Sequence, residues 1–102
     1  MSRAPRKTEI TGTTATLVLP SQDNVTGHIA VNVSGGFDSG NVIIGYLTIG
    51  GDLTTFTEFG ASGDSTLTAA GKIDLLCGQR LDVYAKASGS SPTLTIITSN
   101  IE

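Results

Sequence analysis

Apolar and polar residues alternate along most of this chain. In the segment 28–33, Ile29, Val31 and Val33 occupy every second position, and the segment 80–86 repeats the pattern. A period of two is typical of a strand that buries one side and exposes the other to solvent. No segment places apolar residues at the spacing of a helix face. The pattern therefore predicts an all-β domain.

Turn-forming residues divide the alternating segments into about seven or eight short strands. Clusters of Gly, Ser, Asn, Asp and Pro recur about every eight to twelve residues, which favours an antiparallel β-sandwich or jelly roll. The predicted strands are 13–19, 28–34, 41–49, 53–59, 65–69, 72–76, 80–86 and 93–98.

One predicted strand, 41–49, differs from the others because both of its sides are apolar. We expect it at the centre of a sheet, covered on two sides. Gly45 in its middle predicts a bulge or the close approach of another backbone. In the next segment, Phe56 and Phe59 are expected to anchor the chain in the core.

The length and the aromatic content limit the kind of core that can form. A chain of 102 residues fits one domain. Because it has three Phe, two Tyr and no Trp, the core has to be built mainly from Val, Ile, Leu and Ala. Aromatic residues normally supply much of the buried area of a small domain. A core with so few of them suggests support from neighbouring subunits.

Basic charge is concentrated at the N-terminus. The net charge is −3, but Arg3, Arg6 and Lys7 lie within the first seven residues, and only three basic residues oppose nine acidic ones after them. We therefore divide the chain into a basic N-terminal arm, residues 1–8, and one β-sandwich domain, residues 9–102. Such an arm suits docking on a negative surface, and the alternative is a solvated tail. The small net charge favours neither nucleic acid nor membrane as a partner.

No group of residues in the sequence indicates a catalytic or metal site. His28, the only histidine, falls on the solvent side of its predicted strand, and Cys77, the only cysteine, falls in an apolar run that favours burial. Aspartates are dispersed along the chain, mostly beside turn residues, where Asp binds its own backbone. We expect no enzyme activity, no cofactor and no metal. The dispersed aspartates are Asp23, Asp38, Asp52, Asp64 and Asp74.

Two other features allow more than one interpretation. Asn24-Val25-Thr26 matches the glycosylation sequon, which we interpret as a chance match because no secretion signal precedes it. Tyr46 and Tyr84 belong either to a sugar-stacking surface or to the packing of a sandwich. No apolar run is long enough to span a bilayer. We therefore expect the protein to fold in the cytoplasm of the cell that makes it.

The solvent side of the predicted strands carries Thr, Ser and Asn in place of Lys and Glu. A soluble monomer usually protects its sheet edges with charge, particularly with Lys. Short hydroxyl side chains lose little entropy when they are ordered against a neighbour. This surface predicts a protein that works in contact with other proteins.

The second half of the chain has a particular order of strands and turns. The segment 65–75 contains the small-residue turn Ala70-Gly71, the segment 78–85 is a glycine followed by an Arg-Leu strand, and the segment 91–95 opens a Thr-rich strand. Over residues 41–98, this order resembles small virion proteins of tailed bacteriophages.

The resemblance implies a structural protein of the capsid decoration or cement type. Such a protein is a compact β-sandwich, binds the outer surface of the phage head as a homotrimer and stabilises the capsid by bridging capsomers. Its partners would be the major capsid protein and its own copies, and its place the outer capsid surface of the virion. Arg3, Arg6 and Lys7 would be the capsid-binding residues. The alternatives are a tail, neck or fibre component of the virion, and a carbohydrate-binding or adhesin module.

Overall fold

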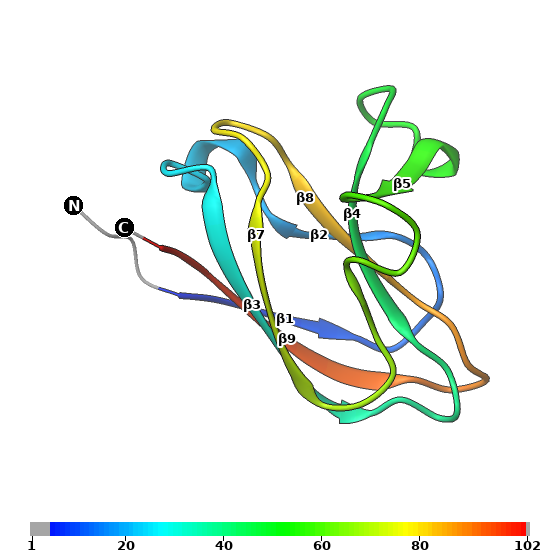
Figure 1. Ribbon diagram of the computed structural model, residues 1–102. Helices are drawn as coiled ribbons and strands as arrows, with labels where there is room; N and C mark the ends of the chain where they lie inside the picture. The colour runs from blue at the N-terminus through cyan, green and yellow to red at the C-terminus, as the bar shows by residue number, and fades with distance from the viewer. Residues whose placement is uncertain (1–4, 102) are drawn as a thin grey trace.

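The alternation seen in the sequence folds into two antiparallel sheets that pack face to face (Figure 1). The computed structural model describes residues 5–101, and the structural statements below refer to these residues. They contain nine strands and two single-turn 3₁₀ helices, η1 (Ser21–Asp23) and η2 (Leu53–Thr55). The prediction of an all-β sandwich is confirmed. Within residues 5–101, there is no helix with the length and apolar character needed to cross a bilayer.

Sheet A has four strands in the order β1–β9–β3–β7, and sheet B has five, in the order β2–β8–β4–β5 with β6 also paired to β4. The strands of sheet A are β1 (Arg6–Ile10), β9 (Thr93–Asn100), β3 (His28–Gly36) and β7 (Gly71–Leu76). The strands of sheet B are β2 (Thr16–Leu19), β8 (Val83–Ala87), β4 (Val42–Leu47), β5 (Phe56–Glu58) and β6 (Thr66–Leu67).

The strand pairings are nested. The first strand pairs with the last, β2 with β8, β3 with β7, and β4 with β5. This is the order of a long hairpin that has been rolled up into two sheets, which is a jelly roll. Of the two architectures that the sequence favoured, the structure therefore has the jelly roll.

The N-terminal boundary differs from the prediction. β1 begins at Arg6 and pairs with β9 from Arg6↔Thr98 to Ile10↔Leu94. Residues 6–8, assigned to the arm, thus belong to sheet A. The reason is that β9 would otherwise leave its backbone groups unpaired at a sheet edge, and an extended segment ending in a buried Ile10 satisfies them.

The core lies between the sheets and follows the alternation. Ile29, Val31 and Val33 are buried as predicted, and so are Val83 and Ala85. The buried hydrophobic residues are aliphatic without exception, while Phe37 and Phe59 pack against them from the margin and are only partly buried. The expectation of an aliphatic core is therefore confirmed for the described residues.

Gly45 lies where another backbone approaches β4, as predicted. A Cβ atom at this position would stand 2.1 Å from the carbonyl oxygen of Thr57 and 2.9 Å from the Phe56 ring. β5 is thus able to lie against β4 only because residue 45 has no side chain.

Three predicted strands begin three residues later than expected, at Thr16, Phe56 and Val83. The last two do so for a local reason. In the segment 53–59, the Asp52 carboxylate accepts a hydrogen bond from Thr54 N at 3.1 Å and caps η2, so that the strand starts at Phe56. In the segment 80–86, Arg80 has a φ of 62°, which turns the chain before β8 starts at Val83.

Candidate functional site

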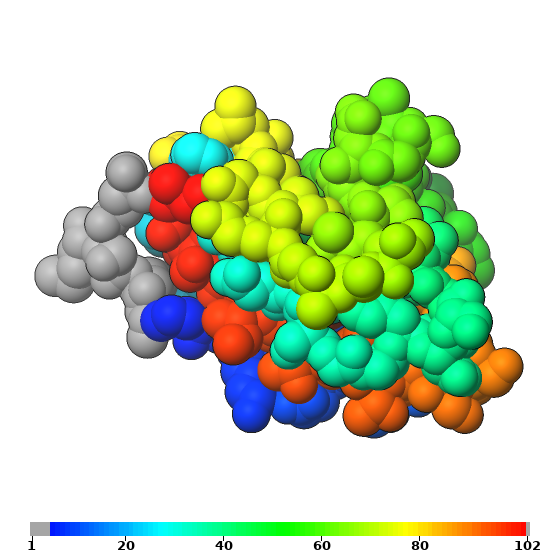
Figure 2. Space-filling model, turned by 60° about the horizontal axis from the view of Figure 1, so that its bottom comes forward, coloured from blue at the N-terminus to red at the C-terminus, as the bar shows by residue number. Residues whose placement is uncertain are grey.

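The outer side of sheet A is a continuous surface built from all four strands. One row of paired residues crosses it, from Lys7 to Ile97, Asn32 and Lys72. Figure 2 shows this side, with β7 in yellow, β3 in cyan, β9 in orange to red and β1 in blue. We call this surface the sheet A face. Its outward residues are Lys7, Glu9, His28, Ala30, Asn32, Ser34, Lys72, Asp74, Leu76, Thr93, Thr95, Ile97 and Ser99, of which Leu76, at the end of β7, is 81% exposed.

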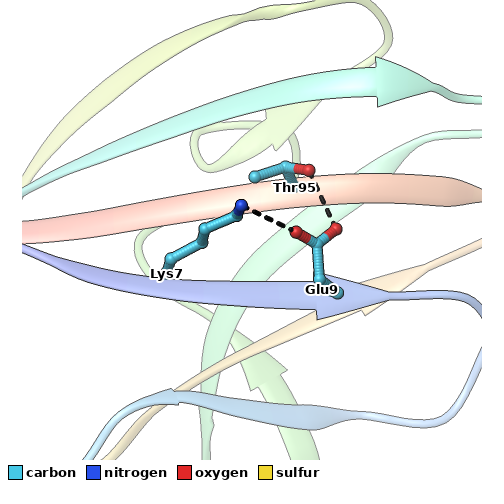
Figure 3. Close-up of polar contacts among 3 residues, drawn as sticks. All are labelled: Lys7, Glu9 and Thr95. Atoms are coloured by element: carbon cyan, nitrogen blue, oxygen red, sulfur yellow. Dashed lines mark hydrogen bonds and ion pairs between the residues drawn. The ribbon is translucent and has the colours of Figure 1, made fainter.

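Charged residues frame the sheet A face on both edge strands, and each is paired within its own strand. On β1, Lys7 Nζ lies 3.4 Å from Glu9 Oε1, and Thr95 Oγ1 donates a 2.9 Å hydrogen bond to Glu9 Oε2 (Figure 3). On β7, Lys72 Nζ lies 3.4 Å from Asp74 Oδ1. Both pairs are exposed, so they add little to stability. Their effect is that a neighbouring carboxylate balances each lysine of the sheet A face.

The centre of the sheet A face carries short side chains and one exposed aliphatic residue. Ile97 is 38% exposed and is flanked on β9 by Thr95 and Ser99. Ala30 and Asn32 lie beside it on β3. An apolar residue surrounded by small polar ones and rimmed by charge has the layout of a protein–protein contact surface.

Of the predicted capsid-binding residues, the structure describes two, both on β1. Lys7 belongs to the sheet A face, where Glu9 balances its charge. Arg6 is exposed at the start of β1, opposite Thr98. Arg3 lies outside the described residues. Arg6 and Lys7 are therefore on an edge strand and not on a free arm.

Three of the dispersed aspartates stabilise loops, as the turn interpretation predicts, whereas Asp74 lies in β7 beside Lys72. Asp64 Oδ2 accepts a hydrogen bond from Ala61 N at 2.9 Å, and Asp38 Oδ2 accepts one from Ser91 N. The hydrogen bonds from Thr54 to Asp52 hold the pKa of that carboxyl below its usual value. Among residues 5–101, no three His, Cys, Asp or Glu residues come close enough to hold a metal ion.

Asn24 is a buried structural residue that the sequence did not reveal. Its Nδ2 donates to the carbonyl oxygens of Gly78 and Leu81 at 2.9 and 3.0 Å, and its Oδ1 accepts from Gly27 N at 3.1 Å. The side chain is completely buried. The amide of the sequon is thus inaccessible to a glycosyl transfer, in line with a chance match. No sequence signal connects Asn24 to partners 54 and 57 positions away.

Cys77 and His28 lie near the end of sheet A. Cys77 is half-buried, less than expected, and burial raises the pKa of its thiol above the usual value, against a weaker opposing effect of the Asn24 amide. His28 is half-buried on β3, opposite Leu76. Of the two tyrosines, Tyr46 packs its ring against Phe59, with centroids 5.1 Å apart, and so acts as a packing residue.

A second candidate site lies on sheet B and was not predicted. It is a hollow of about 210 Å³ between the β4–η2 loop and the loops around η1 and before β8. The β4–η2 loop, the loop around η1 and the loop before β8 all lie at the same end of the sandwich in Figure 1. The hollow is lined by Ser21, Leu47, Gly50, Gly51, Arg80, Leu81, Asp82 and Tyr84. Sequence reasoning singled out Tyr84 alone, since the other residues come from three separate segments.

Comparisons with known proteins give little beyond the fold. No family model matches the chain, and no curated protein matches it. Among solved structures, a similar chain belongs to the work described as "Bacillus endospore appendages form a novel family of disulfide-linked pili". The two chains are 18% identical, the alignment covers 100% of this chain and 92% of that chain, and the TM-score is 0.41. A likeness of this strength carries no argument about function.

Proposed function

We propose that this protein is a structural component of a bacteriophage virion, a capsid decoration protein that attaches to the major capsid protein through the sheet A face. The observation that carries the proposal is the composition of that face, together with the resemblance in residues 41–98. As a homotrimer on the outer capsid surface, the protein would bridge neighbouring capsomers. Its function would then be mechanical, with no turnover.

The side chains of the sheet A face favour docking because they lose little on contact. Ala, Ser, Thr and Asn have few rotamers to freeze, whereas each long charged side chain would cost about 1.5–2 kcal/mol when ordered. The charges of Lys7 and Lys72 are already balanced by Glu9 and Asp74. A partner therefore meets a locally neutral surface and need not supply a counter-charge for each lysine.

The edge of β1 supports a second contact with the shell. In the described part of the chain, β1 pairs only with β9, so its other edge has open backbone groups. The exposed Arg6 lies on this strand. In this proposal, Arg3 and Arg6 bind acidic patches of the major capsid protein beside the sheet A face, while Lys7, paired with Glu9, is part of that face. Several weak contacts per trimer would add up through multivalency.

Replacing Ile97 with Arg tests the sheet A face. We expect Ile97→Arg to weaken attachment to phage particles by about tenfold or more, because a buried cation at the centre of a contact has no partner. The matched control is Leu53→Arg, since Leu53 is 41% exposed, against 38% for Ile97, and lies in η2 on sheet B. Co-sedimentation of purified variants with particles that lack the protein measures the effect.

Two results would contradict the proposal. If Ile97→Arg binds particles as well as Leu53→Arg does, the sheet A face is not the attachment surface. If the protein is absent from purified particles, it is not a virion component. A copy number far below that of the major capsid protein would instead indicate a tail, neck or fibre position.

A further inference from the structure

We infer that the hollow on sheet B is a binding site for a neutral saccharide, one sugar ring in size. This goes beyond the attachment proposed above and does not depend on it, since the hollow opens on the outer side of the other sheet. Tyr84 pairs with Gly45 across β8 and β4, and its neighbours Val83 and Ala85 face the core. Tyr84 therefore points outward, and Leu47, two residues after Gly45, lies on the same side.

Hydrogen bonds hold one wall of the hollow in place. Ser21 N donates to Asp82 Oδ1 at 2.6 Å, and Arg80 Nη1 donates to the carbonyl oxygen of Gln22 at 3.1 Å. The backbone N–H of Arg80 also donates to Asn24 O at 3.0 Å. These contacts join the loop before β8 to η1. The polar side chains at the wall are thus positioned before any ligand arrives, which reduces the entropy cost of binding.

The opposite wall is a short turn that is also fixed. Asp52 N donates to Ile49 O at 3.0 Å, and Gly51 adopts a φ of 81° within this turn. A Cβ atom at Gly50 or Gly51 would meet no other atom within 4 Å, so this wall is low and leaves the hollow open. Openness suits a terminal sugar ring that enters from solvent while the rest of a glycan stays outside.

Arg80 adopts a strained backbone conformation at this site. It has a φ of 62°, a region that residues with a Cβ avoid. Strain of this kind is often found where a side chain has to be held in one place for function. A guanidinium has five N–H donors, and one nitrogen here binds Gln22 O, so that donors remain for a ligand.

The mixture of groups in the hollow fits a sugar better than an ion. Arg80 donates hydrogen bonds, while Asp82 Oδ2 accepts none from any described residue and is left for a ligand. Because a cation and an anion both line the hollow, the attraction of a charged ligand to one is offset by its repulsion from the other. Sugar hydroxyls both donate and accept, and the C–H face of a ring packs on aromatic and aliphatic side chains such as Tyr84 and Leu47.

The size of the hollow limits the ligand to one ring. Its 210 Å³ is below the roughly 300–1,000 Å³ of sites for drug-sized ligands. Few apolar groups line it, so the affinity expected for a monosaccharide is weak, on the order of millimolar.

Titration of the isotope-labelled full chain, followed by two-dimensional NMR, tests the site. The ligands are the methyl glycosides of glucose, galactose, mannose and N-acetylglucosamine, with glycine and inorganic phosphate as a zwitterion and an anion for comparison. We expect at least one glycoside to shift the amide signals of residues 21, 47, 50–51 and 80–84, with smaller shifts from glycine and phosphate.

The variant Arg80→Gly separates binding from folding. Glycine adopts a positive φ freely, so the variant keeps the turn, and this gain offsets the loss of the exposed hydrogen bond to Gln22 O. Its melting temperature should therefore stay about equal. We expect its affinity for the glycoside to fall about tenfold or more, because a charge-assisted hydrogen bond is lost. The matched control is Lys86→Ala, which removes an exposed cation from β8 outside the hollow and should bind like the unmodified chain.

Several outcomes would overturn the inference. They are the absence of shifts with every glycoside, shifts confined to another surface, equal affinity of Arg80→Gly and the unmodified chain, and stronger binding of glycine or phosphate than of any glycoside. Because a folded Arg80→Gly is expected, the loss of binding would not be attributable to unfolding.

Discussion

Sheet A and sheet B belong to one jelly roll but differ in regularity. In sheet A, β3 and β9 pair over eight successive positions, β3 and β7 over six and β1 and β9 over five. In sheet B, the longest ladder, between β4 and β8, has four pairs, and a bulge interrupts β2 between Leu17 and Leu19. A regular sheet presents a flat surface, whereas an irregular one leaves room between its loops. The proposed roles follow this difference.

The outward side chains of the two sheets differ in the same sense. On sheet A they are mainly Ser, Thr and Asn with paired charges at the edges, together with the exposed Ile97 and Leu76. On sheet B, Ile43, Leu47 and Tyr84 face outward and are half-buried, and the Phe56 ring lies over Gly45. Sheet A thus has a broad, mainly polar outer surface, and sheet B a small mixed hollow beside an apolar strip.

The largest effect is expected where sheet B depends on a missing side chain. Gly45→Val places a Cβ 2.1 Å from Thr57 O, so β5 has to move away from β4, at a cost of about 3 kcal/mol in the free energy of unfolding. The matched substitution in sheet A, Gly36→Val, meets no atom within 4 Å and should change stability by less than about 0.5 kcal/mol. Urea denaturation measures both. Equal losses would show that β5 is not held by this contact.

A smaller loss is expected at the crossover from sheet A to sheet B. Asn24→Ala leaves the carbonyl oxygens of Gly78 and Leu81 without their donor, which costs about 2 kcal/mol. The control is Asn32→Ala on the exposed side of β3, where the expected change is within about 0.5 kcal/mol. Denaturation gives the stabilities, and hydrogen exchange should show faster opening of residues 78–82 in the first variant alone. Identical behaviour of both variants would exclude a special role for Asn24.

The smallest effect depends on pH and concerns the loop between β5 and β6. Thr66 Oγ1 and the backbone N–H groups of Gly63 and Ser65 donate to the Glu58 carboxylate and lower its pKa from the ordinary value of 4.5. A lowered folded pKa stabilises the fold above 4.5, and this contribution is lost as the pH falls through the folded pKa.

Glu58→Gln should therefore reduce stability at neutral pH, by less than about 1 kcal/mol, since the site is near solvent. The difference from the unmodified chain should shrink as the pH falls below 4.5. Thermal denaturation over this pH range measures it, with Glu9→Gln on sheet A as the control for removing one carboxylate. A difference that is constant with pH would rule out the titration of Glu58 as its cause.

Much of the fold was predictable because most strands show alternation or an apolar run within their own few residues. The alternation in β3, β8 and β9 and the apolar run of β4 were sufficient to locate those strands. β1 was missed, since Arg6 and Lys7 read as a charged tail and their pairing with β9 spans almost the whole chain. The start of η2 at Leu53 was missed because the capping by Asp52 overrides the apolar character of the segment.

The candidate sites were predictable only in composition. A hydroxyl-rich surface was expected, but which of its side chains lie together depends on how β1, β9, β3 and β7 line up. The hollow on sheet B was not anticipated, because Ser21, Leu47 and Arg80 are far apart in the chain and nothing in the sequence indicates that they share a site.

The order of residues along the chain is enough to specify an aliphatic all-β domain, since the side-chain period of two and the turn residues act over a few positions. The nesting of β1 with β9 and β2 with β8, and hence which polar side chains share a surface, was settled by packing between the sheets. Such pairings join residues up to 92 positions apart, and only burial of the common core makes one register more stable than the others.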